Sequence, residues 1–459
     1  MIEPNVLLFF MKRFLISVIS IFVFGNFSIA QEAFVVQNKQ QTSKVKFKLI
    51  NNLIIIPVEI NGISLSFLLD TGVSKPIIFS FLNVSDTLNI KETETLYLRG
   101  LGEGESVKAL KSKNNIVKIG DAIKLNQDLY ELFDTDLNMA PRLGVPVHGV
   151  IGFDFFKDLV IEINYSSKHI ILTNPENFKY KPCKKCAVLN LEFYNNKPYL
   201  NAEITENEKK IPIKLLIDSG ASDALWLFED DSLGIKSKTN YFNDFLGYGL
   251  SGSVYGKRTT IDALYLQSFV LENANVAYPE STSISSAKNV KNRNGTLAGN
   301  ILKRFNMIID YQNAIITLKK NALFKEPFSY NKSGIELAYD GVRFVKEIDR
   351  KTAAKIGEPP TNEAINSIKI VLEPKYKLSL KPAYTIVELR TNSPAENAGL
   401  MLNDIILTIN GKPSYYYSLQ QLTQMFYDDD GKRIRITVDR NGKELPFTFL
   451  LESPLKRKP

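Results

Sequence analysis

Short apolar runs alternate with polar and turn-forming residues along the chain up to about residue 320. Val, Ile, Leu, Phe and Tyr dominate the runs, and Gly, Asn or Pro interrupts them every several residues, which is typical of β-strands joined by tight turns. Long helical periodicity is not seen in this region, apart from about one turn at 300–305. The pattern predicts a mainly β fold.

Two of the predicted hairpins end in an aspartate. In "LIIIPVEINGISLSFLLDTG" two apolar runs are joined by Asn61 and Gly62, which tolerate positive φ and form the strongest local hairpin signal. This hairpin brings Asp70 to the end of its second strand. In "YLNAEITENEKKIPIKLLIDSG" a charged turn at 206–210 joins two further strands, and the second ends at Asp218.

The spacing after each aspartate predicts a duplication. Gly100 and Gly247, each in a Gly-rich turn, follow their aspartates by 30 and 29 residues, and Gly152 and Gly299 follow by 82 and 81. Each later glycine precedes a strand pair with a Tyr in the turn. We therefore expect one β unit of roughly 145 residues to occur twice, as two lobes at residues 31–180 and 181–328.

The two aspartates need polar partners, because burial between apolar strands disfavours the ionised carboxylate. The residues that follow can provide hydroxyl donors and tight turns whose N–H groups approach a carboxylate. If the lobes face each other, Asp70 and Asp218 can share one proton and activate a water by general acid–base chemistry. The supporting turn residues are Thr71, Gly72, Ser219 and Gly220.

The duplicated unit resembles the retropepsin-like aspartic proteases, with two lobes in one chain, over about residues 45–320. The resemblance implies that Asp70 and Asp218 are catalytic, that 150–152 and 297–299 pack behind them, and that two Gly-rich hairpins form flaps over a peptide substrate. Val73 and Ala298 depart from the usual pattern. The implied flap residues are Gly100, Gly102, Gly247, Tyr248 and Gly249.

The pattern changes in the C-terminal third. In "YTIVELRTNSPAENAGLMLNDIILTINGKP" a strand leads to a short helix opened by Ser393, and a second strand follows. The region 331–455 resembles a bacterial-type PDZ domain with an insertion at about 341–382. By that resemblance, backbone N–H groups of "SGIEL" hold a peptide carboxylate and a helix after Ser418 forms the other wall of a groove. The implied peptide-binding residues are Ser333, Gly334, Ile335, Leu337, Leu419 and Leu422.

The N-terminal stretch "MKRFLISVISIFVFGNFSIAQ" has the basic, apolar and small-residue regions of a secretory signal, so we expect residues 1–30 to be removed after Ala30. The mature chain is predicted to be soluble, and periplasmic or secreted. Among 459 residues, 44% are hydrophobic and 23% charged. The net charge of +8 comes from dispersed Lys and Arg, so no nucleic-acid partner is expected.

The only cysteines, Cys183 and Cys186, are three residues apart. A short structural disulfide is the favoured interpretation in an oxidising compartment, with a redox or metal role as the alternative. No metal or cofactor is expected.

The leading hypothesis is an exported, monomeric aspartic endopeptidase whose PDZ domain binds peptides or protein C-termini. One alternative is a non-catalytic periplasmic peptide-binding or scaffold protein with a degenerate cleft. In a third hypothesis each lobe pairs with a lobe of a second chain.

Overall fold

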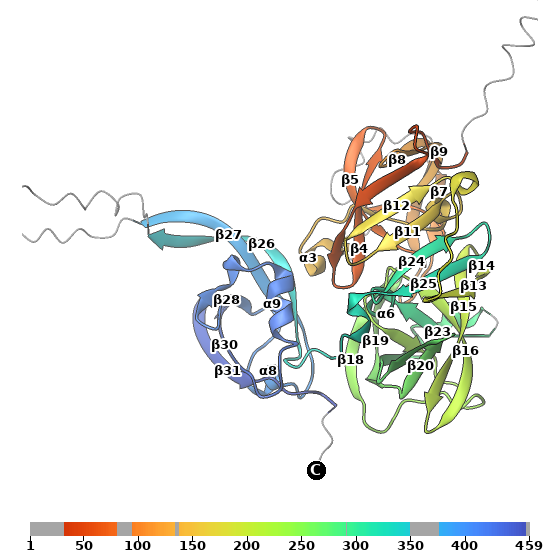
Figure 1. Cartoon of the computed structure of the whole chain (residues 1–459). Helices are drawn as coiled ribbons and strands as arrows, with labels where there is room; N and C mark the ends of the chain where they lie inside the picture. The colour runs from red at the N-terminus through yellow and green to blue at the C-terminus, as the bar shows by residue number, and fades with distance from the viewer. Residues whose placement is uncertain (1–31, 80–93, 134–136, 291, 349–375, 456–459) are drawn as a thin grey trace, which may run out of the picture.

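The computed structural model describes residues 32–79, 94–133, 137–290, 292–348 and 376–455. Within these ranges strands form four sheets, and the helices are short. Figure 1 shows two lobes stacked beside each other and a separate C-terminal domain next to them. The prediction of a mainly β fold is confirmed. The predicted signal at 1–30 lies outside the described residues.

The first lobe is built on the hairpin β4–β5 that the Asn-Gly signal predicts. Ile60 and Ile63 face each other across the turn, and Asn61 and Gly62 have φ angles of 49° and 88°. This two-residue turn with positive φ matches the twist of the strands it joins. The nine described strands of the sheet are β1 (Val35–Val36), β3 (Lys48–Ile50), β4 (Leu53–Ile60), β5 (Ile63–Leu69), β6 (Ile77–Phe79), β7 (Glu94–Leu98), β8 (Val107–Ile119), β9 (Ala122–Leu132) and β10 (Gly149–Ile151).

The second lobe repeats this plan. Its hairpin β15–β16 turns at Asn207 and Glu208, whose φ angles are 49° and 64°, so the charged turn predicted at 206–210 is confirmed and narrowed to two residues. The ten described strands are β14 (Glu192–Tyr194), β15 (Lys197–Glu206), β16 (Lys209–Asp218), β17 (Leu225–Leu227), β18 (Phe242–Gly249), β19 (Gly252–Thr260), β20 (Ala263–Leu266), β21 (Phe269–Glu272), β22 (Asn275–Pro279) and β23 (Arg293–Ala298).

A third sheet joins the two lobes. β11 of the first lobe pairs with β24 of the second, with Ile161 opposite Ile309, and both side chains are buried. Figure 1 shows these strands where the lobes meet. Because each fully buried aliphatic side chain contributes about 1.5–3 kcal/mol, the sheet holds the lobes firmly together. Its six described strands are β2 (Thr42–Lys46), β11 (Val160–Asn164), β12 (His169–Thr173), β13 (Cys186–Asn190), β24 (Phe305–Asp310) and β25 (Ile315–Lys320).

The C-terminal domain is a six-stranded sheet with a short helix against it. The helix α9 (Leu419–Met425) begins at Ser418, which forms a capping box with Gln421. The arms of the predicted insertion are strands continuous with this sheet, and 349–375 lies outside the described residues. The strands are β26 (Ile335–Ile348), β27 (Tyr376–Leu389), β28 (Ile405–Ile409), β29 (Lys412–Pro413), β30 (Arg433–Arg440) and β31 (Lys443–Leu450).

Short helical turns complete the described fold. In the linker between the lobes, Cys183 and Cys186 are joined in a disulfide, as the favoured interpretation predicts. Along the described ranges, no helix has the length and apolar content to cross a bilayer. The remaining helical elements are α3 (Ala140–Leu143), α4 (Phe153–Phe156), η3 (Pro175–Asn177), α5 (Ser285–Lys288), α6 (Gly299–Leu302), η4 (Ala322–Lys325), α8 (Pro394–Asn397) and η5 (Ser414–Tyr416).

Candidate active site

The two aspartates occupy equivalent positions in the two lobes. Asp70 directly follows β5, and Asp218 is the last residue of β16. A parallel strand lies beside each, since β10 pairs with β5 and β23 pairs with β16. The glycine after β10, Gly152, packs so closely that an added Cβ would lie 2.1 Å from the Asp70 carbonyl oxygen. The segments 150–152 and 297–299 therefore take the supporting positions predicted for them.

Two buried hydroxyls cross from lobe to lobe directly below the aspartates. Thr71 Oγ1 donates to the Ile217 carbonyl (2.7 Å) and accepts from the Ser219 N–H (3.0 Å). Ser219 Oγ donates to the Leu69 carbonyl (2.8 Å) and accepts from the Thr71 N–H (3.0 Å). We call these four bonds the crossed hydroxyl network. Each lobe thus fixes the turn that carries the other lobe's aspartate.

The glycines of the two turns bring the carboxyl groups together. Asp70 Oδ1 accepts from the Gly72 N–H (2.6 Å), and Asp218 Oδ1 accepts from the Gly220 N–H (3.0 Å). An added Cβ on Gly220 would lie 2.2 Å from Asp70 Cγ, and one on Gly72 would lie 2.9 Å from Asp218 Cγ. Any side chain at either position would therefore push into the opposite carboxyl group.

The two carboxyl groups lie within hydrogen-bonding reach of each other, so a proton on one of them can be shared with the other. Burial raises the pKa of Asp70 well above its ordinary value, and the negative charge of Asp218 raises it further. The Gly72 N–H and the Lys197 ammonium oppose this shift in the pKa of Asp70. The pair is thus arranged to hold a single shared proton.

Three other side chains near the pair were missed in the sequence analysis. Lys197, at the start of β15, interacts electrostatically with both carboxyl groups, and Arg293, at the start of β23, interacts with Asp218. The third, Tyr311, stacks on Phe156 and interacts electrostatically with Asp70. Its buried hydroxyl has no hydrogen-bond partner among the described residues, and burial raises its pKa. Counting back along the β15–β16 hairpin would have placed Lys197 beside Asp218.

The predicted flap residues lie on two hairpins whose tips meet. The 99–106 loop between β7 and β8 contacts the turn between β18 and β19. Ser251 donates its N–H to the Leu101 carbonyl (2.9 Å) and accepts from the Gly104 N–H (2.7 Å), and its hydroxyl accepts from the Gly100 N–H (3.2 Å). Of the other residues predicted there, Gly102 and Gly247 have positive φ, Gly249 packs against Leu101, and Tyr248 is partly exposed.

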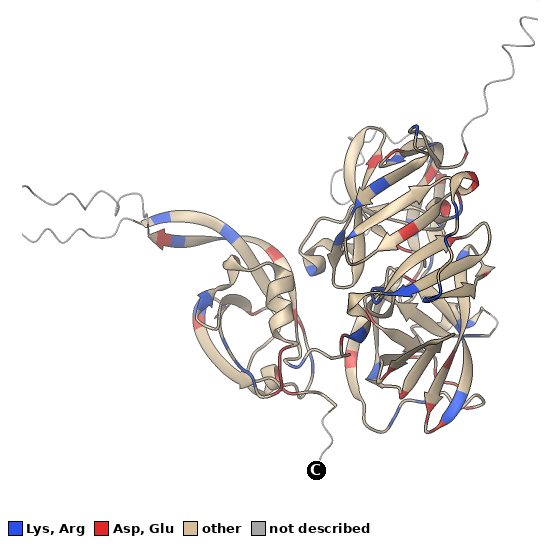
Figure 2. Ribbon diagram, viewed as in Figure 1, with Lys and Arg blue, Asp and Glu red and all other residues tan. Residues whose placement is uncertain are grey.

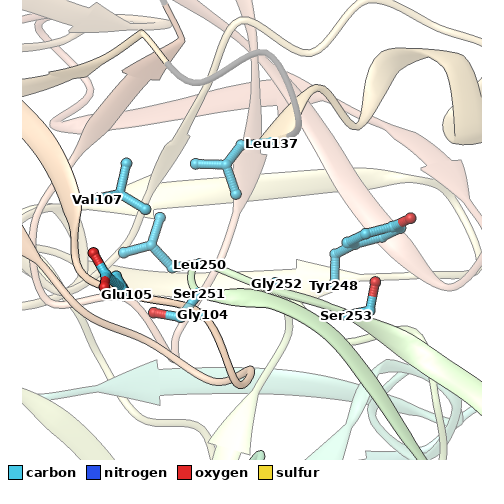
Figure 3. Close-up of a pocket in the computed structure, with 9 residues that line it drawn as sticks. All are labelled: Gly104, Glu105, Val107, Leu137, Tyr248, Leu250, Ser251, Gly252 and Ser253. Atoms are coloured by element: carbon cyan, nitrogen blue, oxygen red, sulfur yellow. The ribbon is translucent and has the colours of Figure 1, made fainter.

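A hollow of about 530 Å³ lies where the two tips meet (Figure 3). Tyr248 and Ser253 line one end of it, while Leu137, Val107 and Leu250 line the other. Neither aspartate is among its lining residues. The hollow is therefore a feature of the hairpin tips and not of the carboxyl pair.

Arg142 connects both lobes with the C-terminal domain. It lies at the end of α3 in the first lobe and donates to Tyr248 Oη (2.9 Å) of the second lobe. The same guanidinium donates to Glu388 (3.0 Å) on β27 and lies over the Phe245 ring at 5.0 Å. One cation thus contacts a flap-like hairpin and the C-terminal domain at once.

The loop predicted to hold a peptide carboxylate uses its N–H groups internally. Asn331 Oδ1 accepts from the N–H groups of Ser333 (3.0 Å) and Gly334 (3.1 Å), and Ser333 Oγ accepts from that of Ile335 (3.0 Å). A peptide carboxylate would need these same donors. The carboxylate-loop assignment stays a prediction, and in this structure Asn331 and Ser333 occupy the donors that it requires.

The strand β26 and the helix α9, which were predicted to form the walls of a peptide groove, are both formed, and the first lobe lies against them. Leu337, Leu419 and Leu422 are buried in the core of the C-terminal domain. In the described sheet β26 pairs only with β27, so its other edge is unpaired. α3 contacts β26, and the following Gly144 packs on Leu419, while Gln420 donates a hydrogen bond to the Leu143 carbonyl.

The distribution of charged residues does not indicate what kind of ligand the chain binds. On the face drawn in Figure 2, basic and acidic residues are interspersed over all three parts. Over the described ranges no group of three or more His, Cys, Asp or Glu is placed to hold a metal ion.

Comparison with known proteins identifies one part of the chain. A family model described as PDZ domain matches residues 385–440. No curated protein matches the chain. The match covers β28, β29, β30, the end of β27 and the helices α8 and α9, and it leaves β26 and β31 outside. The chain therefore contains a PDZ domain at 385–440, a type of module that binds peptides by adding them as a strand.

Proposed function

We propose that this chain is an exported aspartic endopeptidase of retropepsin-like architecture, in which one chain contributes both catalytic carboxyl groups. The observation that carries the proposal is the facing pair Asp70 and Asp218, which lie within hydrogen-bonding reach of each other and are fixed from opposite lobes by the crossed hydroxyl network. A structural turn needs one such aspartate, whereas two facing carboxyl groups that share a proton are expensive to bury. The free-energy cost of burying the two carboxyl groups together is explained if they catalyse a reaction.

The geometry supports hydrolysis without a covalent intermediate. Asp218, as the carboxylate, would take a proton from a bound water while the water oxygen forms a bond to the scissile carbonyl carbon. Asp70, whose pKa is raised, would donate its proton to the carbonyl oxygen. Asp218 then gives its proton to the amide nitrogen, and Asp70 takes one back from a hydroxyl of the tetrahedral intermediate. The C–N bond breaks to give a carboxylic acid and an amine, and both carboxyl groups are in their starting states.

The PDZ domain supports a peptide-binding role for the chain. We propose that it binds substrate segments or protein C-termini beside the catalytic lobes. The signal at 1–30 would place the enzyme in the periplasm or outside the cell, where unfolded or processed polypeptides are its substrates.

The test is cleavage of an unstructured protein by the purified chain from Gln31 onward, between about pH 4 and 7. Asp70→Asn and Asp218→Asn should each lower the rate by at least about a hundredfold, because either change removes one of the two proton-transfer groups. Asp231→Asn is the matched control, since the Asp231 side chain forms an exposed ion pair with Lys236 (2.9 Å).

The outcome separates the enzyme from the peptide-binding scaffold. If the parent cuts and both single variants do not, the shared carboxyl pair is catalytic. If the folded parent leaves every unstructured substrate intact but binds peptides, the scaffold hypothesis replaces the enzyme. Light scattering of the same sample tests the single-chain site, because an obligate dimer would favour pairing of lobes between chains.

A further inference from the structure

The two halves of the carboxyl pair have different neighbours across their hairpins. In β15–β16 the register places Tyr199 opposite Leu216, so continuing it by two residues places Lys197 opposite Asp218. In β4–β5 it places Ile55 opposite Leu68, so the same step places Leu53 opposite Asp70. Residues opposite each other in an antiparallel pair have side chains on the same face, close together. A cation therefore stands in one lobe where the other has an aliphatic side chain.

Two further observations, besides the strand register, place Lys197 near the two carboxyl groups. Its backbone is fixed between two strands, because it also pairs with Tyr194 of β14. Its side chain is partly buried, and Asp218 and Asp70 are the anions that interact with it. Burial lowers the pKa of Lys197, and the two carboxyl groups oppose that shift. The two aspartates are the only carboxyl groups that interact electrostatically with Lys197 in the described part of the chain.

We infer that Lys197 is a positioning residue that makes the carboxyl pair asymmetric, holding the negative charge on Asp218 and leaving the shared proton on Asp70. This inference rests on the proposed function and assigns a role to each carboxyl group. Asp218 becomes the base that takes the proton from water, and Asp70 becomes the acid. The aliphatic Leu53 gives Asp70 no such charge partner, and Leu53 itself is buried.

One other cation near the pair acts in the same direction as Lys197. Arg293 interacts with Asp218 while its guanidinium donates to the Gly295 carbonyl (3.2 Å) and to Thr296 (2.9 Å) on its own strand, so it adds to the asymmetry from a fixed position. Tyr199 interacts with Arg293, and Tyr311 lies on the Asp70 side. Both tyrosines are neutral in the acidic range, because burial raises the pKa of each.

The experiment is the pH profile of kcat/KM for Lys197→Met, which keeps the aliphatic length and removes the charge. Without the cation the pair loses its first proton less readily, so the acidic limb should move to higher pH by about one unit or more. Lys197→Arg should restore the parental limb. Lys214→Met is the matched control on the partner strand β16, because Lys214 pairs with the exposed Glu192 (2.7 Å), and its profile should stay parental. If the acidic limb of the pH profile of Lys197→Met stays at the parental pH, the inference is wrong.

A second measurement keeps the inference testable if the chain proves not to be an enzyme. Thermal unfolding of the parent, Lys197→Met, Asp218→Asn and the double variant gives the coupling between the two side chains. A coupling that favours the charged pair, together with no proteolysis, would refute the proposed function and leave the charge asymmetry standing. Additive effects would refute the role of Lys197, whatever the activity.

Discussion

Thr71→Val removes one hydroxyl of the crossed hydroxyl network and keeps the shape of the side chain. The change leaves the Ile217 carbonyl and the Ser219 N–H without their partners in a region where Thr71 itself is only 1% exposed. Each buried backbone group left unpaired costs about 1–3 kcal/mol, and the methyl group gained by valine offsets about 1 kcal/mol. We therefore expect the free energy of unfolding to fall by about 1–5 kcal/mol.

Urea unfolding followed by tryptophan fluorescence is the suitable assay. Trp226 is the only tryptophan of the chain and is buried in the second lobe, so its signal reports the lobes and not the PDZ domain. The midpoint should fall while the slope of the transition stays unchanged, because the same surface is exposed on unfolding.

Thr205→Val is the matched control for this prediction. It makes the same chemical change at a buried hydroxyl that has no hydrogen-bond partner among the described residues. Stability should change by no more than about 0.5 kcal/mol or rise slightly, because no backbone group loses a partner. If Thr71→Val behaves like Thr205→Val, the crossed hydroxyls do not hold the lobes together and our reasoning about the site is wrong.

Three further predictions concern the same region. Asp70→Asn should be more stable than the parent at pH 7, and the difference in Tm should shrink towards pH 4. The pKa of Asp70 is raised in the folded parent, so the parent loses stability as the pH rises above the pKa of the unfolded chain, about 3.9. Equal differences at both pH values would contradict this. Gly220→Ala should lower the cleavage rate by roughly a hundredfold and by more than Gly72→Ala, because its Cβ would lie 2.2 Å from a carboxyl carbon instead of 2.9 Å; steady-state kinetics on folded variants would show the order. Replacing Cys183 and Cys186 by Ser should cost no more than about 2 kcal/mol in urea unfolding, because the disulfide closes a very short loop.

The parts of the fold set by local sequence were predictable. Asn61 and Gly62 form the expected turn because both tolerate positive φ, and the strands beside them alternate as their apolar residues require. The repeated spacing led to equivalent positions for Asp70 and Asp218. These features depend on neighbours in the chain or on a pattern that occurs twice.

Features that join distant segments were not predictable in the same way. The strand pairs around Tyr165 and Tyr311 were expected separately, but their union in one sheet depends on which edges remain unpaired after each lobe folds. Lys197 was missed because the turn at 206–210 was not narrowed to two residues, and hairpin register follows from turn length. The donors of the PDZ loop were assigned without knowing that Asn331 already occupies two of them.

α3 of the first lobe contacts β26 of the PDZ domain, so peptide binding at β26 and docking of the lobe should be linked. A peptide that adds to the open edge of β26 meets a surface that α3 and Gly144 already cover. If that docking is worth about 1.4 kcal/mol, the peptide binds roughly tenfold more weakly to the whole chain than to a PDZ domain without the lobes. Reciprocity requires that the bound peptide weaken the docking by the same factor, and with it the hydrogen bond that Arg142 donates to Glu388. Peptide binding at β26 and docking of the first lobe on the PDZ domain are then coupled, so a measurement of either one reports the other.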